Sequence, residues 1–78
     1  MKFIIKHEMK GRMRVRLSQK RMTYEQADIL QYYLLCNESV KLAKVYDRTC
    51  DAVINYTGDR EDVIRLLQEF HYQTVEVP

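Results

Sequence analysis

Three side chains with soft metal-binding atoms are expected near one end of the fold that this sequence predicts. They are the thiol of Cys50, the imidazole of His71 and the thioether of Met22. A thiolate, an imidazole and a thioether together suit copper(I), or zinc with fewer ligands. A cysteine in a turn is commonly a tolerated residue, and a histidine at a helix end commonly caps carbonyl oxygens. These residues are therefore candidate metal ligands with an ordinary structural alternative.

The second cysteine, Cys36, is expected in the last turn of a helix, as a small core residue. The predicted topology separates it from Cys50 by about one strand length, roughly 15–20 Å, so the two thiols neither bond to each other nor share a metal ion. Because the sequence shows no secretory segment, we expect both thiols to be reduced and the chain to be cytoplasmic.

No pattern in the chain indicates catalysis. It contains no acid–base pair, nucleophile triad or phosphate-binding loop, and two glycines are too few for a dinucleotide fingerprint. Asp59, Glu61 and Asp62 form a cluster, but they stand where negative charge stabilises the start of a helix. We therefore expect a non-catalytic domain.

Basic residues are concentrated at the start of the chain. Residues 1–22 hold eight Lys and Arg and one acidic residue, whereas residues 23–78 hold five basic and ten acidic residues, for a net charge of +2. Within the basic segment, arginines alternate with apolar residues from Arg12 to Leu17. A period of two predicts a strand with one solvated face and one buried face.

The solvated face of this strand is a candidate docking surface. Phosphates, an acidic protein surface or acidic lipid headgroups would fit its charge, although exposed arginines also simply protect a sheet from aggregation. RNA readers of this topology stack bases on aromatic rings of the central strands, and here only Tyr46 offers a ring. The residues expected at this surface are Arg12, Arg14, Arg16, Lys6, Lys10, Lys44 and Tyr46.

The strands and helices that would position these residues follow from periodicity and turn chemistry. Residues 3–17 are expected to form one long strand with a bulge at Gly11, or a short strand followed by the main one. A helix is predicted over residues 24–36, with Thr23 and Gln26 as a capping box.

The second half of the chain repeats this alternation. Residues 40–46 and 52–56 are predicted to pair as a hairpin, because few residues separate them. A second helix begins after Asp59, and a last strand begins at His71 and alternates through Val77.

This order predicts an α+β domain over residues 1–78. Two amphipathic helices need one sheet face to pack on, and right-handed crossovers then give a ferredoxin-like βαββαβ two-layer sandwich, with a four-stranded antiparallel sheet and both helices on one face. The core is expected to join strand and helix residues: Met13, Val15, Leu17, Val45, Ile54 and Tyr56 with Leu30, Leu34, Leu66, Leu67 and Phe70.

Several of these stretches resemble a known family. The strand Gly11–Leu17, a helix ending in Leu34–Leu35, then Val40, Ala43 and Val45, and the strand Ala52–Tyr56 together resemble heavy-metal-associated domains. The similarity is to the branch at the N-terminus of bacterial heavy-metal-transporting P-type ATPases, which opens with a Gly-Arg-x-Arg strand. It covers about residues 10–70. The resemblance implies a cytosolic appendage of a membrane-embedded metal pump.

The chain lacks one feature of that family. The standard domain carries Met-x-Cys-x-x-Cys between its first strand and first helix, whereas Ser18–Thr23 has no cysteine here. Metal relay is therefore not implied residue by residue, and the resemblance implies a regulatory docking domain or metal binding through other ligands. Two further hypotheses are a stand-alone module that binds RNA or an acidic partner, and an atypical metal chaperone or sensor.

Overall fold

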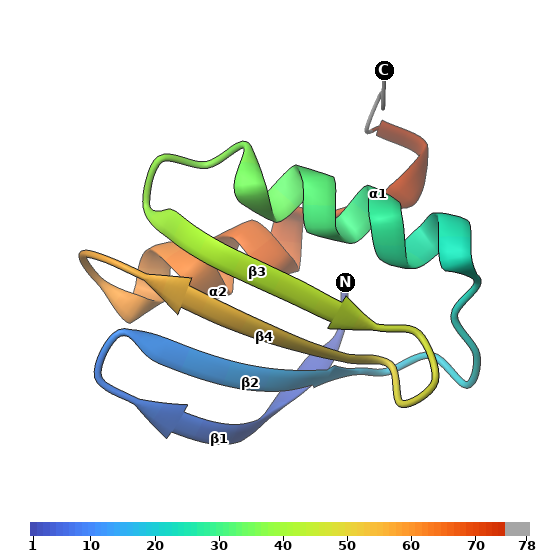
Figure 1. The fold of residues 1–78 in the computed structure, drawn as a ribbon, viewed down its shortest axis with the longest axis horizontal. Coiled ribbons are helices and arrows are strands. Elements are labelled where there is room, and N and C mark those ends of the chain that lie inside the picture. The colour runs from blue at the N-terminus through green and yellow to red at the C-terminus, as the bar shows by residue number, and fades with distance from the viewer. Residues whose placement is uncertain (75–78) are drawn as a thin grey trace.

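The fold is a two-layer α+β sandwich with a ferredoxin-like arrangement, as predicted. The structure is a computed structural model and describes residues 1–74. The strands pair antiparallel in the order β1-β2-β4-β3, and both helices cover one face of this sheet (Figure 1). The elements in chain order are β1 (Phe3–Met9), β2 (Arg12–Leu17), α1 (Tyr24–Leu35), β3 (Val40–Tyr46), β4 (Asp51–Tyr56), α2 (Arg60–Glu69) and the 3-10 turn η1 (Tyr72–Thr74).

The edge strand beside β2 differs from the prediction. Residues 3–17 form a hairpin of two antiparallel strands, so β1 occupies the edge that the C-terminal strand was predicted to fill. The predicted last strand began at His71, but Tyr72–Thr74 form a 3-10 turn. The remainder of that predicted strand, residues 75–78, lies outside the described residues.

Gly11 makes the β1–β2 turn possible. Its φ is +79°, a conformation that glycine adopts without steric cost. A Cβ at this position would lie 3.3 Å from the carbonyl oxygen of Tyr56, and the Tyr56 amide donates a hydrogen bond to the Gly11 carbonyl at 2.9 Å. The turn therefore packs directly against the end of β4.

Helix α1 begins at the predicted capping box. The Thr23 side chain accepts a hydrogen bond from the Gln26 amide, and the Gln26 side chain accepts one from the Thr23 amide. Its buried face is Ala27, Leu30 and Leu34. Cys36 lies two residues beyond Leu34, about 200° around a helix, so it is exposed and its prediction as a core residue was wrong.

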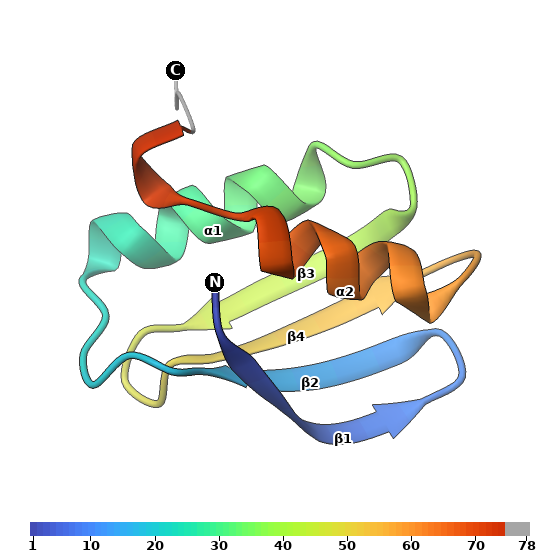
Figure 2. The same cartoon turned by 180° about the vertical axis from the view of Figure 1, so that it is seen from behind.

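Helix α2 packs with α1 against the same sheet face. Asp59 is the N-cap residue, although its side chain makes no capping hydrogen bond. The Tyr33 hydroxyl of α1 donates to the Leu66 carbonyl of α2 at 2.7 Å, and the Phe70 ring lies 4.8 Å from the Tyr33 ring. Seen from behind, the N-terminus lies beside α2 (Figure 2), where the Met1 ammonium donates to the Gln68 carbonyl at 2.8 Å.

The core lies between the helices and the sheet. Of the predicted core residues, all are buried except Val45 and Leu66, which are partly buried. Both sheet edges are modified. Strand β1 has a register shift between Ile5 and His7, and at the β3 edge the Val45 amide donates to the Gln31 side chain at 3.2 Å. Such features discourage pairing with another strand.

Candidate functional site on the open face of the sheet

The sheet face opposite the helices, here called the open face, carries three rows of side chains that cross the strands. Each row is named after its arginine on β2 and follows from the strand register. The Arg12 row is Met9, Arg12, Asn55 and Leu42. The Arg14 row is His7, Arg14, Val53 and Lys44. The Arg16 row is Ile4, Arg16, Asp51 and Tyr46.

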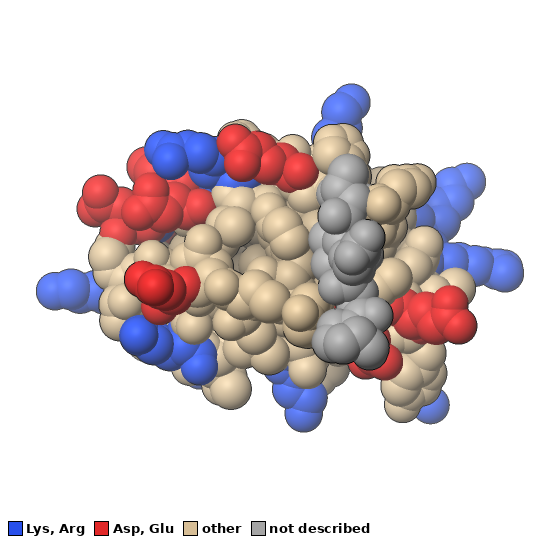
Figure 3. Space-filling model, turned by 90° about the horizontal axis from the view of Figure 1, so that it is seen from above, with Lys and Arg blue, Asp and Glu red and all other residues tan. Residues whose placement is uncertain are grey.

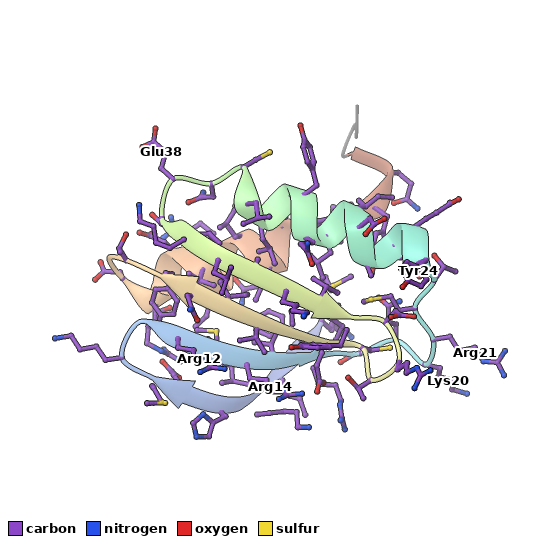
Figure 4. All side chains as sticks on the ribbon, viewed as in Figure 1. Arg12, Arg14, Lys20, Arg21, Tyr24 and Glu38 are labelled. Atoms are coloured by element: carbon purple, nitrogen blue, oxygen red, sulfur yellow. The ribbon has the colours of Figure 1, made fainter. Side chains whose placement is uncertain are left out.

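The predicted alternation along β2 is confirmed. Met13, Val15 and Leu17 are fully buried under the helices, and the three arginines are exposed on the open face. Figure 4 labels Arg12 and Arg14 on this strand. The predicted neighbour Lys44 joins them on β3, and Lys10 lies in the hairpin turn beside the Arg12 row. The open face therefore collects cations from β1, β2 and β3.

Asp51 lies in the Arg16 row of this basic surface and was missed by the sequence reasoning. Its side chain is buried, with 1% of the residue exposed. One carboxylate oxygen accepts from Nε and Nη2 of Arg14 at 3.2 and 3.0 Å, and the other accepts from Nε of Arg16 at 3.1 Å. The ammonium of Lys6 lies 3.7 Å away. One carboxylate thus holds three cations.

The surroundings of Asp51 keep it ionised. Burial by itself raises the pKa of this carboxyl. The hydrogen bonds from Arg16 and Arg14 and the charge of Lys6 lower the pKa by more than burial raises it, so the pKa falls below its ordinary value. A charged Asp51 fixes two guanidinium groups in place while leaving part of each exposed. Its role in this arrangement is to position Arg14 and Arg16.

Asp51 was missed because it lies one residue before the start of the predicted strand. That strand was expected over residues 52–56, whereas β4 begins at Asp51. With this start, the alternation that buries Ala52 and Ile54 directs Asp51 to the open face, directly opposite Arg16. An acidic residue opposite an arginine is a stabilising cross-strand pair.

The ring of Tyr46 is already in contact with cations. The Arg14 guanidinium lies 5.8 Å and the Lys44 ammonium 5.5 Å from its centroid, both within the range of cation–π attraction. Among the residues of the three rows, Tyr46 alone has a phenyl, phenol or indole ring. This arrangement lacks the paired aromatic platform on which RNA-binding sheets of this topology stack bases.

The candidate metal ligands lie at the predicted end of the fold, in different environments. Cys50 and Met22 are both buried in the core, and Cys50 is only 5% exposed. His71 follows α2 at an exposed position. Within residues 1–74 there is no group of three or more His, Cys, Asp or Glu that could hold a metal ion. A metal bound here would depend on the Met22 sulfur as a ligand, and the site stays a prediction.

The two free cysteines lie at opposite ends of the sheet. Cys50 precedes β4, and its carbonyl accepts a hydrogen bond from the Leu17 amide at the end of β2. Cys36 caps α1 at the other end, shortly before β3 begins at Val40. This separation is the one that the predicted topology required.

Charge on the helix side is arranged differently. Seen from that side, acidic side chains lie on the surface and most basic side chains project at its rim (Figure 3). The pair between Arg60 and Glu8 lies near the hairpin end of the molecule, where Arg60 also binds Glu61. The helix side therefore bears exposed acidic side chains, in contrast to the arginines of β2 on the open face.

The comparisons with known proteins assign no relative. No protein-family model, characterised protein or solved structure matches the chain. Among residues 1–74, neither helix has the length and apolar character needed to span a bilayer. The function is therefore argued from the open face itself.

Proposed function

We propose that this protein is a non-catalytic docking domain that binds an acidic protein surface through the open face. The observation that supports this most strongly is the charge of the three rows and the adjoining Lys6. Of the five cations there, Lys6, Arg14 and Arg16 pair with the carboxylate of Asp51. The other two, Arg12 and Lys44, form no ion pair within residues 1–74. Such a surface attracts an acidic partner and orients it before contact.

The composition of the open face favours a protein partner over a nucleic acid or a membrane. Arginine, methionine and tyrosine are enriched where proteins bind each other, and all three are present. Exposed apolar side chains also stand at both edges of the face, with Met9 on β1 and Leu42 on β3. Phosphate backbones and lipid headgroups would leave these apolar groups without partners.

The resemblance to heavy-metal-associated domains suggests which protein the docking domain belongs to. In that setting the chain is a cytosolic regulatory domain of a heavy-metal-transporting P-type ATPase, and the acidic partner is another part of the pump. A coding sequence that continues into membrane spans and an Asp-Lys-Thr-Gly phosphorylation motif would support this setting. A coding sequence with neither feature would contradict it without affecting the docking proposal.

Binding to polyglutamate tests the docking proposal. Labelled polyglutamate should bind the protein at low salt and dissociate as the salt concentration rises, because the attraction is between solvent-exposed charges. The Arg12→Glu/Lys44→Glu variant should lose this binding. These positions are chosen because neither bonds to Asp51, so the fold is retained.

The control places the same change of charge elsewhere. Lys20 and Arg21 lie in the loop between β2 and α1, beyond the strands (Figure 4), so the Lys20→Glu/Arg21→Glu variant should retain most of the binding. Equal losses in both variants would overturn the proposal, as would binding of RNA oligonucleotides or anionic lipid vesicles without binding of polyglutamate.

A further inference from the structure

The three arginines of the open face are not equivalent. Arg14 and Arg16 donate hydrogen bonds to Asp51, and Arg14 also lies against the Tyr46 ring. For Arg12, no carboxylate of residues 1–74 comes within ion-pair distance, and its guanidinium is exposed. Arg12 is thus the arginine of β2 whose charge the described fold leaves uncompensated.

The neighbour of Arg12 on β4 is also unsatisfied. Asn55 lies directly opposite Arg12 in the register, and its side-chain oxygen is buried without a hydrogen-bond partner. A buried amide oxygen without a donor is uncommon and costs free energy. The pair therefore offers a cation that needs an acceptor beside an oxygen that needs a donor.

Apolar side chains stand at both ends of the same row. Met9 is 57% exposed on β1, and Leu42 is 56% exposed on β3. Beside Arg12, a hollow of about 350 Å³ opens between β1, β2 and β4, with Val53 among its lining residues. The other residues that line it are His7, Met9, Arg12 and Arg14.

The dimensions of the Arg12 row fit an extended peptide. Met9 and Leu42 are separated by three strand spacings, about 14 Å, which four or five extended residues would span. A peptide can supply a side-chain carboxylate for Arg12 and apolar side chains for Met9 and Leu42. It can also supply a backbone N–H for the Asn55 oxygen once the part-exposed Asn55 side chain turns outward. A phosphate group supplies only an anion for Arg12.

We infer that the Arg12 row binds an extended segment of the partner in which acidic and apolar residues alternate, with a carboxylate on Arg12 and a backbone amide on Asn55. This inference rests on the docking proposal and adds the residues that select the segment. The Arg14 and Arg16 rows then contribute general positive charge on a frame that Asp51 holds. Specificity comes from the row that the fold leaves unsatisfied.

Two labelled peptides of equal charge test this inference by fluorescence anisotropy. In one, glutamates flank leucines, and in the other each leucine is replaced by serine. The wild-type protein should bind the leucine peptide more tightly. Arg12→Gln should weaken that binding about tenfold, the value of one charged hydrogen bond, whereas Lys44→Gln, with the same loss of charge on the same face, should weaken it far less.

Leu42→Ser provides an independent readout. It should weaken binding of the leucine peptide and leave binding of the serine peptide unchanged, because only the former has an apolar side chain to bury. Circular dichroism would verify that each variant is folded. Because Leu42 and Arg12 are exposed, neither substitution removes core packing.

The possible results distinguish the inference about the Arg12 row from the docking proposal on which it rests. Equal effects of Arg12→Gln and Lys44→Gln, or equal affinity for the two peptides, would overturn the Arg12-row inference and leave the docking proposal standing. Absence of binding to either peptide and to polyglutamate would overturn both.

Discussion

The guanidinium of Arg14 donates two hydrogen bonds to a single carboxylate oxygen of Asp51, from Nε at 3.2 Å and from Nη2 at 3.0 Å. This contact joins two central strands, since Arg14 lies on β2 and Asp51 begins β4. It holds a basic group on an exposed surface without removing its charge from solvent. The positioning of a docking surface and the stability of the sheet therefore depend on the same carboxylate.

Replacing Asp51 with alanine should destabilise the protein by about 1–3 kcal/mol. The substitution removes hydrogen bonds from Arg14 and Arg16, while the part-exposed guanidinium groups remain able to bind water, which keeps the loss below that of a fully buried pair. Urea denaturation measures this difference. Glu38→Ala is the control, because Glu38 is exposed in the loop before β3 (Figure 4), and a loss as large there would contradict the assignment.

The stability contributed by Asp51 should depend on pH in one direction. Its pKa is lowered on folding, so the unfolded chain binds the proton more readily than the folded protein does. The contribution is therefore fully present well above the ordinary pKa of 3.8 and is lost as the pH falls through the lower folded value. The stability difference between wild type and Asp51→Asn should shrink on acidification. A stability difference that widens on acidification would contradict a lowered pKa of Asp51.

Gly11→Ala should destabilise the protein more than Gly58→Ala. Both glycines have positive φ, so each substitution costs about 1 kcal/mol of backbone strain. At Gly11 the added methyl also meets the Tyr56 carbonyl oxygen at 3.3 Å, whereas at Gly58 nothing lies within 4 Å. Thermal or urea denaturation of the two variants isolates the steric part. Equal losses would mean that the hairpin does not pack against β4 in this way.

Copper(I) should bind weakly, and Cys50→Ser should not change its affinity. The Cys50 thiol is buried in the core with Met22, whereas His71 lies at an exposed position. A competition titration with a copper(I) chelator under reducing conditions measures this. Sub-micromolar binding that Cys50→Ser abolishes would instead favour the metal chaperone or sensor hypothesis.

The parts of the fold that could be predicted are those with a strong local pattern. The alternation from Arg12 to Leu17 fixed the buried side of β2, and the Thr23–Gln26 capping box located the start of α1. Val63, Leu67 and Phe70 share one helix face and are buried together. In each case one short stretch contains all the information that the prediction needs.

The missed features depend on relationships between distant residues. Strand β1 was hidden because polar residues from Lys6 to Lys10 looked like an interruption, whereas an edge strand over an open face tolerates them. Whether β1 or a C-terminal strand would pair with β2 is a choice between two distant segments. The role of Asp51 likewise requires the β2–β4 register, which no local pattern contains.

The most direct test of the docking claim is to map the binding surface by NMR. Polyglutamate would be titrated into the isotope-labelled protein, and amide shifts would be followed residue by residue. The account predicts saturable shifts along β2, β3 and β4, largest around Arg12, Lys44 and Asn55, with little change in α1 and α2. Shifts confined to the helices, or spread evenly over both faces of the molecule, would contradict it.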